Sequence, residues 1–268
     1  MKIKANGIFV NYELVGNGKC LTLIHGMGSN LNSWRYQVPA FSQHYKVLTY
    51  DVRGHGQTEA NDEELTIELW VADLYALLKD LNINETFLLG HSMGGSIALQ
   101  FTLKHANIVK ALILSSSVGA RGRTEKEIHE GAIARQAEIE AIKKDGMKAL
   151  VRNRLMHNFS PGFVEKNPEI AEWYKSIQLQ NTTERYLRLI KHSEHPSSKP
   201  DLSKISCPTL VMAGEYDFGV LAEAIVFQKD ITGSQFKVFP TAHATYAEVP
   251  QDYNETVLKF LAGLTYSE

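Results

Sequence analysis

Ser92 is the residue with the strongest potential for covalent chemistry, and it lies in the segment TFLLGHSMGGS that spans residues 86–96. A serine hydroxyl is a poor nucleophile at neutral pH. It needs a general base within hydrogen-bond reach and a third group that orients the base. Ser92 therefore predicts acyl transfer only if other parts of the chain bring a base and an orienting acid to it.

The residues around Ser92 predict a sharp turn between a strand and a helix. Residues 86–89 are apolar or β-favouring, and apolar residues recur at helical spacing over 97–101. Gly90 and Gly94 stand two positions on either side of the serine, where a tight turn leaves no room for side chains. Such a turn directs backbone N–H groups at charge that develops beside the serine. By itself, the segment favours a glycine-rich turn with a solvent-facing serine, so its partners decide the chemistry.

Candidate partners for Ser92 stand just past later predicted strands. The chain has 10 histidines, and only His243 lies beyond the acidic turn that follows the seventh predicted strand. Asp217 stands in that turn, which gives the chain order Ser, Asp, His. Glu215 stands two residues earlier. Because a two-residue shift moves a side chain by a full pleat or around a turn, only one of these carboxylates can reach His243.

Strands that alternate with helices predict the frame that positions these residues. Hydropathy alternates over residues 2–15 and breaks at Asn6-Gly7, which predicts an antiparallel hairpin. The other predicted strands are apolar runs over 21–24, 46–50, 86–89, 111–115, 209–213 and 236–239. Helices are predicted over 29–41, where Pro39 ends or kinks the helix, over 65–81, and around 257–260.

This alternation predicts a mostly parallel sheet with helices on both faces. Ligands of such sheets bind at the carboxyl ends of the strands. His25-Gly26, Asp51 and Ser92 all stand just past strand ends, so we expect them to meet at one edge. Asp51, Arg53 and His55 are expected to hold their loop by local hydrogen bonds rather than to take part in catalysis.

The segment 119–199 differs from the rest, since it is charged and helical and contains no strand pattern. Thr124 with Glu127 suits a capping box, Gly146 is expected to end the first helix, and Asn167-Pro168 is typical of a helix start. We predict an α/β core domain over 1–118 and 200–268 with an inserted helical cap, or lid, over 119–199. An independent helical domain is the alternative.

The assembled motifs resemble the α/β-hydrolase fold family over essentially the whole chain. They are His25-Gly26, Asp51-Val52-Arg53-Gly54-His55-Gly56, Gly90-His91-Ser92-Met93-Gly94-Gly95, Cys207-Pro208-Thr209, Gly214-Glu215-Tyr216-Asp217 and His243. The resemblance implies a mostly parallel eight-stranded sheet, with Ser92 as nucleophile, Asp217 rather than Glu215 as the acid, and His243 as base. It implies that the backbone N–H groups of Met27 and Met93 form the oxyanion hole. The family often has a proline shortly after the acid; residues 218–221 lack one, so we expect an unusual loop there.

The serine nucleophile narrows the reactions that the resemblance implies. Haloalkane dehalogenases and many epoxide hydrolases of this fold use an aspartate at the elbow. Carbon–carbon hydrolases of the family tend to have Asn before the serine and Trp after the histidine, where this chain has His91 and Ala244. The predicted function is a serine carboxylesterase or enol-lactonase that cleaves a small ester or lactone through an acyl-serine. Carbon–carbon hydrolysis, thioester hydrolysis and a ligand receptor with little turnover remain alternatives.

Several residues near the predicted site are candidates for substrate contact. Arg121 could hold a substrate carboxylate together with Arg123, although a solvated surface pair is the alternative. Trp173 and Tyr186 could line an acyl pocket, or could pack the cap instead. His25 and Gly26 could face substrate, or could only organise their loop.

Composition limits the other partners. The net charge of −2 at pH 7 gives no electrostatic basis for binding nucleic acid or an anionic membrane. Cys20 and Cys207 are expected to be buried thiols rather than a disulfide. We expect a cytoplasmic protein without a signal peptide, membrane insertion, metal or cofactor, acting on a small molecule as a monomer or homodimer.

Overall fold

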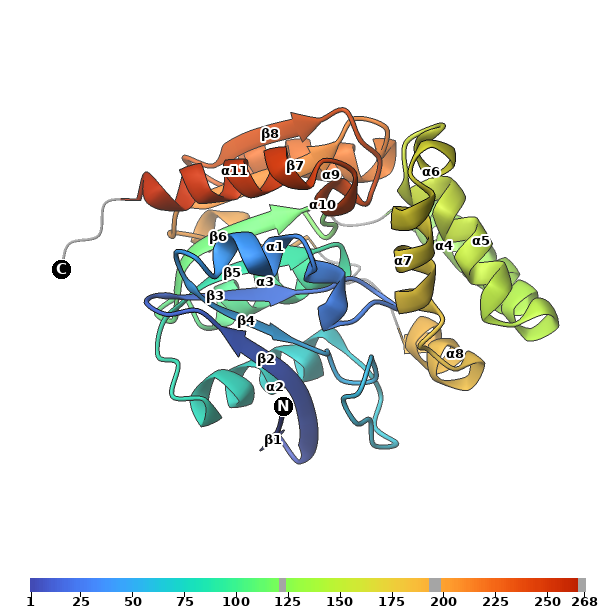
Figure 1. The fold of residues 1–268 in the computed structure, drawn as a ribbon, viewed down its shortest axis with the longest axis horizontal. Coiled ribbons are helices and arrows are strands. Elements are labelled where there is room, and N and C mark those ends of the chain that lie inside the picture. Colours follow the sequence, from blue (N-terminus) through green and yellow to red (C-terminus); the bar gives the residue numbers. More distant parts are fainter. Residues whose placement is uncertain (121–123, 193–198, 265–268) are drawn as a thin grey trace.

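Eight strands form a single sheet in the residues that the computed structural model describes, which are 1–120, 124–192 and 199–264 (Figure 1). The sheet order is β1-β2-β4-β3-β5-β6-β7-β8. The first two strands pair antiparallel, β2 pairs antiparallel with β4, and all later pairings are parallel. The predicted fold class is confirmed. The strands are β1 (Lys2–Ala5), β2 (Ile8–Val15), β3 (Cys20–Ile24), β4 (Lys46–Tyr50), β5 (Thr86–His91), β6 (Val109–Ser115), β7 (Thr209–Gly214) and β8 (Gln235–Phe239).

Helices cover both faces of the sheet. The helices that belong to the sheet layers are α1 (Gln37–Phe41), α2 (Ile67–Asp80), α3 (Met93–Lys104), α9 (Phe218–Asp230), α10 (Thr245–Glu248) and α11 (Pro250–Ala262), with short 3₁₀ turns η1 (Leu31–Trp34) and η2 (Leu202–Lys204). Side chains alternate between the two faces along each buried strand. In β3, for example, Leu21 and Leu23 pack with α1 and α11, whereas Cys20 and Ile24 pack with α2 and α3.

A group of helices lies between β6 and β7 in the sequence. They are α4 (Glu125–Asp145), α5 (Met147–Asn158), α6 (Phe163–Lys166), α7 (Pro168–Gln178) and α8 (Thr183–His192). Thr124 and Glu127 form the expected capping box, and Gly146, at φ 67°, follows the end of α4. Figure 1 shows this group beside the carboxyl ends of the parallel strands. We propose that these helices are the cap predicted over 119–199, above a core of 1–118 and 200–268.

Two local predictions were wrong. Residues 29–41 do not form one helix that Pro39 ends. They form η1 and then α1, and Pro39 stands in the first turn of α1, where the missing N–H would have had no helical partner. After Asp217 the chain enters α9 directly, so no unusual loop follows the acid. The buried residues Val220, Ala224 and Phe227 of α9 have helical spacing, so the signal was present in the sequence.

A buried ion pair holds the loop after β4. The Arg53 guanidinium donates from Nε to Asp73 Oδ2 and from Nη2 to Asp73 Oδ1, each at 2.7 Å, and both side chains are almost inaccessible to solvent. Asp51 accepts from the Leu31 and Gln57 N–H groups, at 2.8 and 2.7 Å. These residues therefore anchor the loop to α2 and to the start of η1.

Breaking the buried ion pair is expected to lower the stability of the folded protein. Asp73→Asn removes the charge that compensates Arg53 and should lower the free energy of unfolding by about 3–5 kcal/mol. Glu63 also contacts Arg53 but is half exposed, so Glu63→Gln should cost less than about 1 kcal/mol. Urea unfolding of the two variants measures the difference. Equal losses of stability would mean that burial does not determine how much each carboxylate stabilises the protein through Arg53.

No helix among the described residues combines the length and the apolar character needed to cross a membrane. Cys20 and Cys207 are free thiols, and burial raises the pKa of both, that of Cys207 to about 11.

Candidate active site

Ser92 occupies a strained turn between β5 and α3. Its backbone has φ 55° and ψ −120°, a region that residues other than glycine seldom adopt and that is found mainly at functional sites. A Cβ on Gly90 would overlap the Gly94 carbonyl, and a Cβ on Gly94 would overlap the Ile24 carbonyl. The glycines therefore allow the chain to turn closely enough to present Ser92 at the carboxyl end of β5.

Asp217 and His243 are brought together by the ends of β7 and β8. The His243 Nδ1–H donates to Asp217 Oδ2 at 2.5 Å, and about one-fifth of each side chain is exposed. Glu215 is exposed and has no hydrogen bond to the histidine in the described chain. The structure thus pairs His243 with Asp217, the carboxylate that the family resemblance implied, and not with Glu215.

Glu248 holds the loop that carries His243. This buried carboxylate accepts the Ala242 N–H at 2.8 Å and also accepts from the N–H and hydroxyl of Ser160 in the proposed cap. Sequence reasoning missed Glu248, because its place five residues after His243 carries no motif. It ties the histidine loop to the segment between α5 and α6.

His91 connects His243 with the serine turn. The ring centroids of His91 and His243 are 4.9 Å apart, and His91 also packs on Tyr246. Burial lowers the pKa of His91, which makes it a weak base suited to packing. Among the described residues no hydrogen bond joins the Ser92 hydroxyl to His243. Such contacts often close only in the substrate complex.

The loop after β3 passes directly beside the serine. A Cβ on Gly26 would lie 3.3 Å from Ser92 Cβ. Met27 follows Gly26, and Met93 is the first residue of α3, where N–H groups have no helical acceptor. In the described part of the chain, neither the Met27 N–H nor the Met93 N–H donates a hydrogen bond to another protein group. Both N–H groups are therefore available beside Ser92.

Residues of the proposed cap hold this loop in place. Arg154 Nη1 donates to the Met27 carbonyl at 2.8 Å, and Asn181 Nδ2 donates to the Gly28 carbonyl at 2.6 Å. Asn30 Nδ2 donates to Gln180 Oε1 at 2.8 Å. The conformation of the loop next to Ser92 thus depends on residues more than 120 positions later in the chain.

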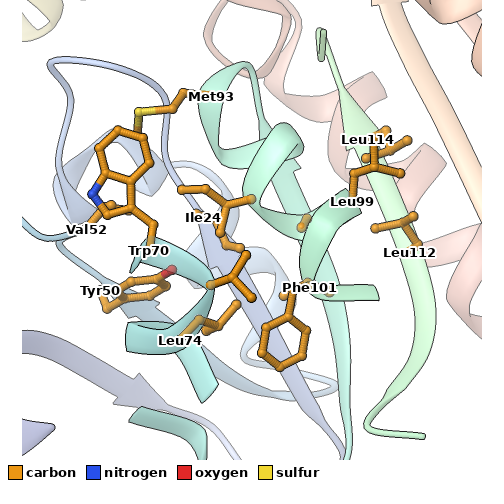
Figure 2. Packing of buried hydrophobic residues seen from close by; sticks show 14 of the residues in the cluster. Ile24, Tyr50, Val52, Trp70, Leu74, Met93, Leu99, Phe101, Leu112 and Leu114 are labelled. Atoms are coloured by element: carbon orange, nitrogen blue, oxygen red, sulfur yellow. The ribbon is translucent and has the colours of Figure 1, made fainter. Parts of the chain in front are cut away.

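A cavity of about 870 Å³ opens onto Ser92 between the core and the helices α4, α5 and α8. Ser92, Met93, Met27 and Tyr186 are part of its wall. Figure 2 shows the Met93 side chain against the Trp70 indole, and both residues line the cavity. The space is large enough for a small organic substrate.

The predicted contacts His25, Gly26 and Trp173 are not part of the wall of this cavity. His25 is fully buried; its Nε2 accepts the Val52 N–H at 3.0 Å, so its protonated Nδ1 donates to the Gly26 carbonyl at 2.8 Å. Its role is to organise the loop, and Gly26 contributes close backbone packing. Trp173 packs edge-on against Tyr36, at the contact between α7 and the core, so its side chain is occupied by packing. Arg121 and Arg123 lie outside the described residues.

Similarity to known proteins identifies the family of this chain. The sequence model of the alpha/beta hydrolase fold family matches residues 20–248. The chain belongs to the α/β-hydrolase fold family. Among the residues described for this α/β hydrolase, no group of three or more His, Cys, Asp or Glu side chains is arranged to hold a metal ion.

The relatives of this α/β hydrolase include several enzymes. It is 27% identical over 258 residues to 3-oxoadipate enol-lactonase 2 of Acinetobacter baylyi, covering 95% of this chain and 94% of the relative. It is 28% identical to 2-hydroxy-6-oxo-6-(2'-aminophenyl)hexa-2,4-dienoic acid hydrolase of Metapseudomonas resinovorans, covering 97% and 90%. The crystal structure of the enol-lactonase from Burkholderia xenovorans LB400 superposes with a TM-score of 0.87 at 25% identity, covering 98% and 100%. As the sequence predicted, the protein is a hydrolase.

Proposed function

We propose that this α/β hydrolase cleaves a small carboxylic ester or lactone through an acyl-serine intermediate. The observation that carries the proposal is the 2.5 Å hydrogen bond between His243 Nδ1 and Asp217, at the sheet edge that also presents Ser92. This bond fixes the histidine tautomer with the proton on Nδ1, so Nε2 is free to accept a proton.

The proposed reaction has two halves. His243 Nε2 takes the proton of Ser92 Oγ as the oxygen attacks the substrate carbonyl, and the N–H groups of Met27 and Met93 receive the resulting oxyanion. Collapse breaks the C–O bond, and His243 returns the proton to the leaving alkoxide or enolate. Water then loses a proton to His243, attacks the acyl-serine and releases the carboxylic acid and Ser92. Asp217 stabilises the imidazolium in both halves.

The enol-lactonases among the relatives support lactones and esters as the substrate class. The strained Ser92 turn supports nucleophilic attack, because such a conformation persists only where surrounding structure enforces it. The cavity beside Ser92, which core residues and the helices α4, α5 and α8 line, suits a substrate of modest size because its volume is about 870 Å³.

Turnover of simple esters tests the proposed function. Purified protein should hydrolyse p-nitrophenyl acetate or butyrate, and a panel of small lactones, for many cycles per enzyme. Rapid quenching should trap an acyl group on Ser92, detectable by peptide mass spectrometry. One burst without steady turnover would favour a ligand receptor. No product from any ester or lactone and no acyl adduct would contradict the proposal.

A further inference from the structure

Arg154 is a cation in the cavity wall whose hydrogen-bond partners are neutral. It stands on α5, is partly buried, and lines the cavity that opens onto Ser92. Its Nη1 donates to the Met27 carbonyl at 2.8 Å and its Nη2 donates to Tyr186 Oη at 2.6 Å. In the described chain none of the ion pairs includes Arg154.

The phenol of Tyr186 connects Arg154 with Glu138 by hydrogen bonds, and no ion pair joins the two charged side chains in the described chain. The Tyr186 hydroxyl, which accepts a hydrogen bond from Arg154, donates to Glu138 Oε1 at 3.3 Å. Burial raises the pKa of Tyr186 to about 12, so the phenol is neutral at pH 7 and supplies no counter-charge. Desolvated cations are usually paired, and a guanidinium has five donors in a fork that matches a carboxylate.

The position of Arg154 places this charge close to the reacting group. Arg154 donates to the carbonyl of Met27, and the N–H of Met27 belongs to the proposed oxyanion hole. Gly26, the residue before Met27, passes so close to Ser92 that a Cβ on it would lie 3.3 Å from Ser92 Cβ. The wall of the cavity carries Arg135, Arg152 and Arg154, against Glu138 and Asp145. Neither carboxylate forms an ion pair with Arg154 in the described chain, so the guanidinium next to the Met27 loop is the group that can pair with an anionic ligand.

We propose that Arg154 binds a carboxylate of the substrate, so that the enzyme prefers esters or lactones that carry a free carboxylate a few bonds from the scissile carbonyl. This inference rests on the proposed function, because it assigns the substrate class of the same site. Arg154 determines specificity by charge-assisted hydrogen bonds to the substrate, while Tyr186 keeps its guanidinium in place.

A matched pair of substrates tests the inference. Monomethyl succinate and methyl butyrate have the same acyl chain length, and they differ in a terminal carboxylate or methyl group. Hydrolysis is followed by pH-stat titration at pH 7. For Arg154→Gln we expect the ratio of kcat/KM for monomethyl succinate over methyl butyrate to fall by about 10- to 100-fold. Arg154→Lys should keep part of the ratio, since the charge remains and the fork is lost.

Two controls separate specificity from structure. Arg152→Gln removes an exposed arginine on the same helix and should change the ratio by less than about threefold, because solvent and salt screen it. If Arg154 only supports the Met27 loop, Arg154→Gln slows both esters equally and the ratio stays constant. That constant ratio would overturn the inference.

A binding measurement tests Arg154 apart from catalysis. In Ser92→Ala protein, calorimetry should detect monomethyl succinate, and Arg154→Gln added to that background should weaken its affinity at least about tenfold. Unchanged affinity would also overturn the inference. If the wild type hydrolyses neither ester but the binding loss is seen, the proposed function fails while the carboxylate site stands.

Discussion

Ser92→Ala is expected to reduce kcat/KM for p-nitrophenyl butyrate by about 10⁴- to 10⁶-fold. The substitution removes the oxygen that forms the acyl-enzyme, and the residual rate comes only from binding and the oxyanion donors. Alanine tolerates the φ of 55° about as poorly as serine does, so folding should change little. Steady-state kinetics with each purified variant measures the loss.

Ser96→Ala is the matched control for this prediction. Ser96 also lines the cavity, one helical turn after Ser92, and its hydroxyl donates to the Val118 carbonyl at 2.9 Å. Its removal should leave kcat/KM within about fivefold, because the hydroxyl is committed to the backbone. Equal rates for the wild type and Ser92→Ala, with thermal melting unchanged, would show that hydrolysis does not pass through Ser92.

Asp217→Asn is expected to lower kcat/KM by roughly 10³- to 10⁴-fold. The amide carries no charge to stabilise the imidazolium, and its NH₂ group can hold His243 in the wrong tautomer. The expected effect falls on kcat, since the interaction strengthens only as charge develops on the histidine. Stopped-flow measurement of acylation with p-nitrophenyl acetate would locate the loss in the first half-reaction.

Glu215→Gln provides the comparison for Asp217. Glu215 is exposed and lies in the same turn, so the change removes an equal charge near His243 without touching its Nδ1–H. Its kcat/KM should stay within about threefold of the wild type, because exposed charges are screened. A larger loss for Glu215→Gln than for Asp217→Asn would assign the acid to Glu215 and contradict the geometry.

Local sequence patterns predicted much of the frame because they act over a few residues. Asn6-Gly7 predicted the hairpin of β1 and β2, and both residues have positive φ, as a tight hairpin turn requires. The apolar runs predicted the buried strands, and Thr124 with Glu127 predicted the start of α4. Where local interpretation failed, at Pro39 and in α9, the pattern was present and only the boundary or the element was misjudged.

The proposed cap could not be predicted to the same depth. Its helix starts follow from local signals, but the face that each helix turns to the core depends on partners far along the chain. Trp173 illustrates this, since its helical spacing suited a pocket or a packed interface equally, and contact with Tyr36 selected the second. Arg154 and Glu248 carried no motif, and their importance is visible only in what they touch.

The sequence by itself determined the sheet and the serine turn, and, with the family resemblance, the order of Ser92, Asp217 and His243. Turn chemistry and hydrophobic period act between near neighbours, and topology then carries strand ends to one edge. The residues alone left Asp217 and Glu215 in competition, and only the tertiary structure showed the hydrogen bond from His243 to Asp217 and placed Arg154 against the Met27 carbonyl, 127 positions away. Such contacts depend on how whole layers pack, because spacing along a chain does not specify which distant side chains meet.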